Sequence, residues 1–290
     1  MTLLLRGPIL DLYVSISPKR VWYATWVISL VSALAIFIPS FLIFYPGLTF
    51  HYLVGGSVAI LLLGPAIVEH FQELRKKRID NALPLLLNDI GEGQETGMTL
   101  LESLREISNR DYGPLSKELK KLVSQMSWGV DFSTAFRSFT SRVGTSMTLK
   151  VSILIVEAVN FGGDLKTAFR STADFLRELL ELRQERQVQL RPFFLVIYVS
   201  SLIFDLIVIT LYQSFILPLA PPPLADGGVS FLRMPLTLGE FRSILFDMAI
   251  IEAFFGGLAA GKFGTGRALS GLKHSVLLMG VAIVVFWAFF

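Results

Sequence analysis

The sequence predicts an all-α integral membrane protein with about five transmembrane helices and a cytosolic bundle of about six helices. Three observations favour this class. Hydrophobic residues make up 53% of the 290 residues and charged residues only 17%, whereas soluble domains usually have about 45–50% and about 25%. Apolar runs long enough to cross a bilayer lie toward both ends of the chain. Between them, residues 69–191 hold 18 of the 26 Lys and Arg and 17 of the 23 Asp and Glu.

The N-terminal segment 1–20, expected in the cytosol, precedes a transmembrane hairpin at 21–68. Crossing about 30 Å of hydrocarbon takes about 20 apolar residues, and the hairpin provides two such runs around a turn at Pro46. Trp22 and Tyr45 lie at the two ends of the first run, where interfacial aromatic side chains are expected.

Three more spans fill the C-terminal transmembrane region, 192–290. They are residues 192–217, 243–260 and 272–290. The Pro- and Gly-rich segment 218–242 separates the first two and is expected to be a linker on the outer side.

Lysine and arginine predict the orientation, because short cytoplasmic loops carry an excess of them. The segment before the first span and the 261–273 loop together hold six, whereas the 46–47 turn and the 218–242 segment hold two. The charged region 69–191 lies on the same side as the basic loops. We therefore expect a multi-pass protein of the cytoplasmic membrane, with the N-terminus and this region in the cytosol and the C-terminus outside.

The cytosolic region 69–191 contains an internal repeat. Residues 129–139 (GVDFSTAFRSF) and 162–172 (GGDLKTAFRST) are identical at seven of eleven positions, at an offset of 33 residues. A weaker third copy begins at Gly97 (GMTLLESLR). The repeat predicts three similarly built helix starts, which by itself indicates architecture rather than activity.

Each copy of the repeat combines a helix-ending glycine with a residue that caps the next helix. The predicted caps are Thr99, Asp131 and Asp164. Apolar residues at the first and fifth positions after each cap are four apart and are expected to face one core.

Two charged stretches continue transmembrane helices into this region without a helix breaker, at 69–78 and 173–191. Helices that leave the membrane unbroken can transmit rigid-body motion between a cytosolic domain and the bilayer. Mechanical support of the domain is the alternative interpretation.

Asp205, Asp247 and Glu252 fall within the predicted spans. Ionisable groups at that depth are costly and are candidate functional residues. A buried polar contact between helices or subunits is the favoured interpretation, and a proton relay is an alternative. Neither aspartate has the Gly-x-Gly-Asp setting of the aspartyl peptidases that cleave prepilins.

No catalytic, cofactor or metal site is predicted. The chain has no cysteine, which excludes thiolate nucleophiles, cysteine metal ligands and disulfides. His51, His70 and His274 lack metal or triad spacing and are expected at interfaces or in solvent.

GGLAAGKF at 256–263 fits most of a Walker A motif, but Phe263 replaces the required Ser or Thr, and close helix packing explains the small residues better. A nucleic-acid partner is not expected, because the charged region has a net charge of only +1.

The order and spacing of these motifs resemble the type II secretion system F domain family. The resemblance rests on TGMTLLESL at 96–104, the repeat at 129–136, and GGDL at 162–165 with the charged helix that follows. It covers about residues 80–191. The arrangement of the flanking spans around this region also resembles that of the family. The GLKH stretch at 271–274 is similar to the archaeal branch of the family.

The resemblance implies a platform protein of the inner or cytoplasmic membrane in a type IV pilus-like machine, such as an archaeal pilus, an archaellum or a Tad pilus. Such a protein couples a cytosolic hexameric secretion ATPase to the extraction of pilin subunits from the membrane, and has no enzymatic activity of its own. Many members carry two such domains. A single domain implies a homodimer, or a pair with a sister single-domain protein.

The loops of the bundle are the predicted sites of ATPase contact. They lie around residues 109–113, 129–131, 144–145 and 162–164. The candidate interface or intramembrane polar residues are Arg110, Asp111, Asp131, Arg142, Asp164, Asp205, Asp247 and Glu252.

The alternative function is a membrane subunit of a transporter coupled to an ATP-hydrolysing partner. It would use the intramembrane carboxylates for the passage of substrate or protons. Five spans without an inverted repeat argue against it.

Overall fold

The computed structural model describes residues 18–44, 47–219 and 237–289. The segment before residue 18 and most of the predicted 218–242 linker are not among them. Throughout the described residues the regular secondary structure is helical, which confirms the predicted all-α class.

The chain separates into two compact units. The first, here called the membrane unit, comprises the described residues within 1–70 and 189–290. The second, here called the central unit, comprises residues 71–188. Two long helices, α3 (Leu48–Glu95) and α8 (Leu165–Leu211), each contribute to both units.

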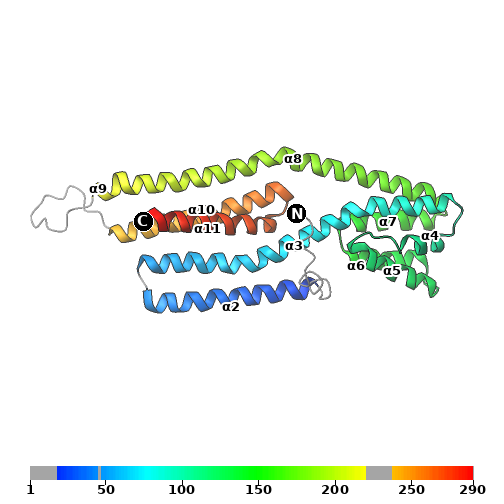
Figure 1. The fold of residues 1–290 in the computed structure, drawn as a ribbon, viewed down its shortest axis with the longest axis horizontal. Helices are drawn as coiled ribbons and strands as arrows, with labels where there is room; N and C mark the ends of the chain where they lie inside the picture. The colour runs from blue at the N-terminus through cyan, green and yellow to red at the C-terminus, as the bar shows by residue number, and fades with distance from the viewer. Residues whose placement is uncertain (1–17, 45–46, 220–236, 290) are drawn as a thin grey trace, which may run out of the picture. The chain divides into compact units, whose positions relative to one another are not determined.

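Among its described residues, the membrane unit has five helices that are long and apolar enough to cross a membrane, as predicted. Besides its parts of α3 and α8, it contains α2 (Pro18–Phe44), η1 (Tyr212–Ile216), α9 (Leu217–Leu219), α10 (Leu238–Thr265), η2 (Ala268–Gly271) and α11 (Leu272–Phe289). The long helices lie side by side (Figure 1). Apolar side chains cover much of their outward faces, which is typical of helices surrounded by lipid.

Helix α10 extends beyond the predicted 243–260 span at both ends. Thr237 and Glu240 form a capping box at its start, which satisfies two free backbone N–H groups. Gly266 ends the helix in the left-handed conformation with φ +76°, a conformation that favours glycine. The Walker-like segment 256–263 is therefore wholly helical, without the loop that would bind phosphate.

The central unit is a bundle of six helical segments. Between α3 and α8 it contains α4 (Leu100–Ile107), α5 (Pro114–Ser127), α6 (Phe132–Val143) and α7 (Ser146–Asn160). One apolar core joins all six, and its fully buried members include Leu86, Leu104, Leu119, Phe136, Ile155 and Phe169.

The three copies of the repeat form the same structure, a helix C-terminus followed by a capped helix. Gly97, Gly129 and Gly162 all have positive φ, between +65° and +88°. At the second copy, the Gly129 N–H donates to Met126 O and the Val130 N–H donates to Gln125 O, which is the hydrogen-bond pattern of a Schellman motif. The other two copies have the equivalent pair of bonds.

Candidate functional site

The three repeat turns gather at one end of the central unit. Ser133 Oγ donates to Asn160 Oδ1 at 3.1 Å, which joins the second turn to the third. Glu95 pairs with Lys166 at 2.9 Å and also with Arg170, which joins the first turn to the third. In Figure 1, α3 ends and α8 begins at the same end of this unit. We call residues 96–99, 128–131 and 161–164 the three-turn end.

Two aromatic side chains project from the three-turn end into solvent. Trp128 is 86% exposed and Phe161 is 85% exposed, and each stands directly before the glycine of its repeat copy. Met98 and Val130 add smaller exposed apolar surfaces to the same turns. Exposed aromatic residues of this kind are typical of protein interaction sites. The prediction from the sequence named only charged residues in these turns. Aligning the two most similar repeat copies places Trp128 and Phe161 at the same position, so the sequence did contain a signal for this aromatic pair.

Asp131 and Asp164 at the three-turn end cap the helices that follow them. Asp131 Oδ2 accepts a hydrogen bond from the Ser133 N–H at 2.9 Å, and Asp164 Oδ1 accepts one from the Lys166 N–H at 3.1 Å. The Thr167 hydroxyl also donates to Asp164, and this bond holds the pKa of the Asp164 carboxyl below its ordinary value. Both carboxylates therefore have a structural role at this end.

The other two predicted contact loops lie elsewhere in the central unit. Helix α5 runs toward the turn at 128–131, and α6 runs back from it. Residues 109–113, which precede α5, and residues 144–145, which follow α6, therefore lie at the other end of these two helices from the three-turn end. Arg142 Nε donates to Glu118 Oε2 at 2.6 Å there, which joins the end of α6 to the start of α5. The four predicted loops thus form two separate groups.

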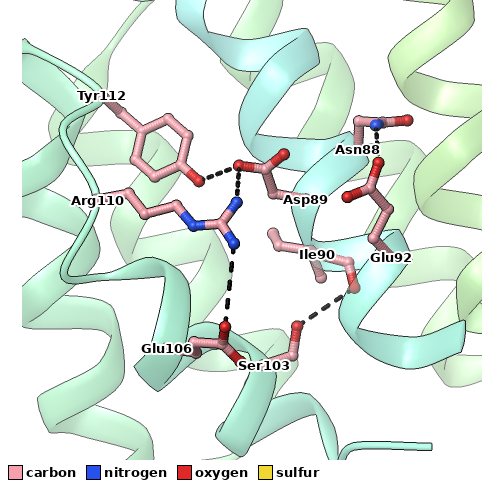
Figure 2. A network of polar contacts seen from close by, with 8 residues as sticks. All are labelled: Asn88, Asp89, Ile90, Glu92, Ser103, Glu106, Arg110 and Tyr112. Carbon is pink, nitrogen blue, oxygen red and sulfur yellow. Dashed lines mark hydrogen bonds and ion pairs between the residues drawn. The ribbon is translucent and has the colours of Figure 1, made fainter. Parts of the chain in front are cut away.

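A buried carboxylate fixes the 109–113 loop to α3 (Figure 2). Asp89 Oδ2 accepts hydrogen bonds from the Tyr112 hydroxyl at 2.5 Å and from Arg110 Nη1 at 3.0 Å. Burial, followed by the hydrogen bond to Asp89, raises the pKa of the Tyr112 hydroxyl above its usual range. Within the loop, Asp111 Oδ1 accepts from the Gly113 N–H at 2.8 Å. Arg110 and Asp111 therefore hold the loop in shape, a function that the sequence did not predict.

Lowering the pH below 4.5 is expected to weaken the packing of α5 against α6. Burial acts to raise the pKa of the Glu118 carboxyl, but hydrogen bonds from Lys121 and Arg142 outweigh it and leave this pKa below the ordinary 4.5. Stability from a carboxyl with a lowered folded-state pKa is fully present above its unfolded-state pKa and is lost as the pH falls through the folded-state value. Thermal unfolding of the wild type and of Glu118→Gln, from about pH 7 to about pH 3, measures this.

Glu118→Gln should be the less stable chain at neutral pH and should approach the wild type in acid. The variant Glu106→Gln is a control, since Glu106 lies farther from its partner Arg110, at 3.9 Å, and is exposed. A stability difference for Glu118→Gln that stays constant with pH would contradict the expected linkage.

Several polar side chains of the membrane unit pair between helices. His51 Nδ1 lies 2.9 Å from Asp247 Oδ2, which joins α3 to α10. Ser201 Oγ on α8 donates to Glu252 Oε2 on α10 at 2.8 Å. Both contacts join helices, although the Asp247 side chain is 47% exposed and its contact is therefore not the buried one that the sequence favours. The prediction that His51 is merely interfacial or solvated is incomplete, because it has a specific acidic partner 196 residues away.

His274 is partly buried and Asp205 is buried in the membrane unit. His274 Nδ1 lies 2.6 Å from the Tyr198 hydroxyl, which joins α11 to α8, so this histidine, like His51, has a specific partner that the prediction of an interfacial or solvated position did not include. Asp205 is 3% exposed, and its Oδ1 atom has no hydrogen-bond partner among the described residues. Within those residues, no three acidic or histidine side chains converge so that they could hold a metal ion.

These features define a class: a multi-pass helical membrane protein with a helical domain carried between its membrane spans. The family described as type II secretion system (T2SS), protein F matches residues 86–212. Residues 86–212 are thus similar to the type II secretion system F domain family, which confirms the resemblance read from the repeat. The match extends beyond the 80–191 region of that resemblance, through the membrane part of α8.

Two relatives come from the archaeon Methanocaldococcus jannaschii. An uncharacterised protein, MJ1286, is 23% identical over 261 residues, which are 90% of this chain and 42% of that protein. Flagella accessory protein J is 27% identical over 146 residues, which are 50% of this chain and 24% of that protein. This chain thus spans less than half the length of either relative. No solved structure matches it significantly.

Proposed function

We propose that this chain is a platform subunit, without enzymatic activity of its own, in a type IV pilus-like machine for filament assembly or secretion. The F-domain match across residues 86–212 carries the proposal, because proteins of this family are membrane platform subunits. The similarity to a flagella accessory protein favours an archaeal filament machine, such as an archaellum or archaeal pilus, over a bacterial Tad pilus.

In this proposal the central unit and the N-terminus lie in the cytosol and the C-terminus lies outside. The basic flanks of the spans support this orientation, since Lys and Arg concentrate on the side of the central unit. A cytosolic central unit is accessible to an ATPase.

A hexameric secretion ATPase docks on the three-turn end in this proposal. Trp128 and Phe161 supply the apolar contact, and Asp131 and Asp164 lie beside them in the same turns. Along α3, this end lies about 36 Å from Phe71, where the central unit begins. Such a position leaves room for a large partner. Arg110, Asp111 and Arg142 belong to the second group of loops and are proposed as secondary contacts.

Motion of the ATPase passes to pilin subunits through α3 and α8 in this proposal. Both helices run without interruption from the central unit into the membrane unit, and an α-helix resists axial compression because its backbone hydrogen bonds run along its axis. The pilin subunits are extracted from the bilayer beside the membrane unit.

A second platform domain completes the machine. The chain covers 42% of the length of MJ1286, so that relative has room for additional domains beyond the part that matches this chain. A homodimer, or a pair with a sister single-domain protein, provides that second domain.

The double substitution Trp128→Ser and Phe161→Ser is expected to weaken binding of a purified secretion ATPase, from the same organism, by about 30-fold or more. Removing an aromatic hot-spot residue typically costs about 2 kcal/mol or more, and each 1.4 kcal/mol is a factor of about ten. Binding is measured with the full chain in lipid nanodiscs, and filament assembly is scored in cells. The matched control is Leu149→Ser with Ile153→Ser, which removes exposed apolar side chains from α7 instead.

Two results would count against these proposals separately. If the double variant bound the ATPase as tightly as the wild type, the three-turn end would not be the docking site. The proposed platform function would be unaffected by that result. Co-purification of a transport ATPase or a substrate-binding protein, in place of a secretion ATPase and pilins, would favour the transporter alternative.

A further inference from the structure

A polar strip runs along the membrane part of α8. Tyr198, Ser201 and Asp205 are spaced by three and four residues, so they lie on one side of the helix. Leu202 and Leu206, on other sides of the helix, are strongly exposed and are expected to face lipid. The strip therefore faces α10 and α11, and its polar groups must find partners within the protein.

Two acidic residues lie at this strip, Asp205 on α8 itself and Glu252 on the neighbouring α10. Glu252, on α10, accepts the hydrogen bond from Ser201 Oγ at 2.8 Å, and Ser201 lies one helical turn from Asp205. The Glu252 carboxyl therefore lies on the side of α10 that meets this strip, close to Asp205. Asp205 is almost completely buried, with its Oδ1 atom unpartnered in the described structure.

The remaining titratable groups near this strip leave the pair without a positive partner. His274 on α11 contacts Tyr198, which lies two helical turns from Asp205. Asp247 on α10 pairs with His51 on α3. Within the described residues, no Lys, Arg or His forms an ion pair with Asp205 or Glu252. Two ionised carboxylates at this depth would each lack solvation and would repel one another.

We propose that Asp205 and Glu252 together bind one proton, held chiefly on Asp205, in the membrane-spanning part of the protein. The proton is placed on Asp205 because this residue is almost completely buried and its Oδ1 atom has no hydrogen-bond partner in the described structure, whereas Glu252 accepts a hydrogen bond from Ser201. A metal cation fits the site poorly, because calcium and magnesium require about six or more oxygen ligands, and the pair offers two carboxyl groups and one hydroxyl. This inference is independent of the proposed platform function.

Infrared spectroscopy of the full chain in lipid bilayers tests the proposal, because a protonated carboxyl group has a carbonyl band distinct from that of a carboxylate. At neutral pH the wild type should show this band, and the band should shift when aspartate is labelled with carbon-13. Asp205→Asn should abolish it. Asp247→Asn, which changes another intramembrane carboxyl, is the matched control and should retain it.

Glu252→Gln supplies a second measurement. Removing the neighbouring negative charge should lower the pH at which the aspartate band disappears, by about one unit or more. The proposal is overturned if the labelled wild type lacks the aspartate band at neutral pH, or if the band survives Asp205→Asn. It is also overturned if adding sodium at constant pH removes the band, since the pair would then hold a metal cation in place of the proton.

Discussion

Replacing Gly261 by valine is expected to destabilise the membrane unit by about 3 kcal/mol or more, because overpacking a close backbone contact typically costs 1–3 kcal/mol and occasionally more. A Cβ atom at Gly261 would lie 2.0 Å from the Gly271 backbone nitrogen and 2.1 Å from its Cα. One turn earlier, a Cβ at Gly257 would lie 2.1 Å from the Ser275 nitrogen. Backbone atoms cannot move aside as a flexible side chain does, so the substitution forces α10 away from the start of α11.

Gly280→Val is the matched control for this prediction. Gly280 lies on α11, and a Cβ there would meet nothing within 4 Å. Both variants add the same side chain to a membrane helix, so the helix propensity of valine affects them alike. Thermal unfolding in lipid nanodiscs should show a large loss for Gly261→Val and little change for Gly280→Val. Equal unfolding temperatures would mean that the α10–α11 contact is not tight.

The small residues of 256–263 illustrate what the sequence could predict. Their spacing favoured close helix packing over nucleotide binding, and the Gly257 and Gly261 contacts agree with that interpretation. Likewise, the repeat predicted the positions of three capped helix starts, because a helix-ending glycine and a following cap are local features. Local rules of this kind can be applied to a single sequence without knowledge of the fold.

Contacts between distant residues were not predictable in the same way. Asp89 precedes Arg110 by 21 residues, and His51 precedes Asp247 by 196 residues. Neither pair has a characteristic spacing, since their meeting depends on how whole helices pack. The sequence therefore identified Arg110 and Asp247 as candidates from their type and place, but could not identify the partners that satisfy them.

Helix ends were a second source of difference between the prediction and the structure. Hydropathy marks the lipid-facing part of a helix, whereas backbone hydrogen bonding continues until a cap or a glycine stops it. Helix α10 thus runs to Gly266, beyond its apolar stretch. Helix α8 passes through Pro192 in the same way. This continuity is what allows the central unit and the membrane unit to share α3 and α8.

Phe136→Ala is expected to destabilise the central unit by about 3–5 kcal/mol, the usual cost of removing a buried phenylalanine side chain. Phe136 on α6 is almost completely buried and its ring stacks on Phe132 at a centroid distance of 5.1 Å. Phe132 in turn contacts Phe169 of α8 at 6.4 Å. The cavity would therefore loosen α6 from the helix that continues into the membrane unit.

Hydrogen–deuterium exchange of the full chain in nanodiscs measures this loss locally. Peptides from α6 and from the first turns of α8 should exchange much faster in Phe136→Ala, whereas peptides from α10 and α11 should be unchanged. Phe161→Ala is the matched control, because it removes the same side chain from an exposed position of the three-turn end. If both variants exchanged alike, the aromatic cluster would not stabilise the bundle. If only Phe136→Ala lost protection while Phe161→Ala retained it, any loss of ATPase binding in Phe161→Ala would reflect the docking surface rather than the fold beneath it.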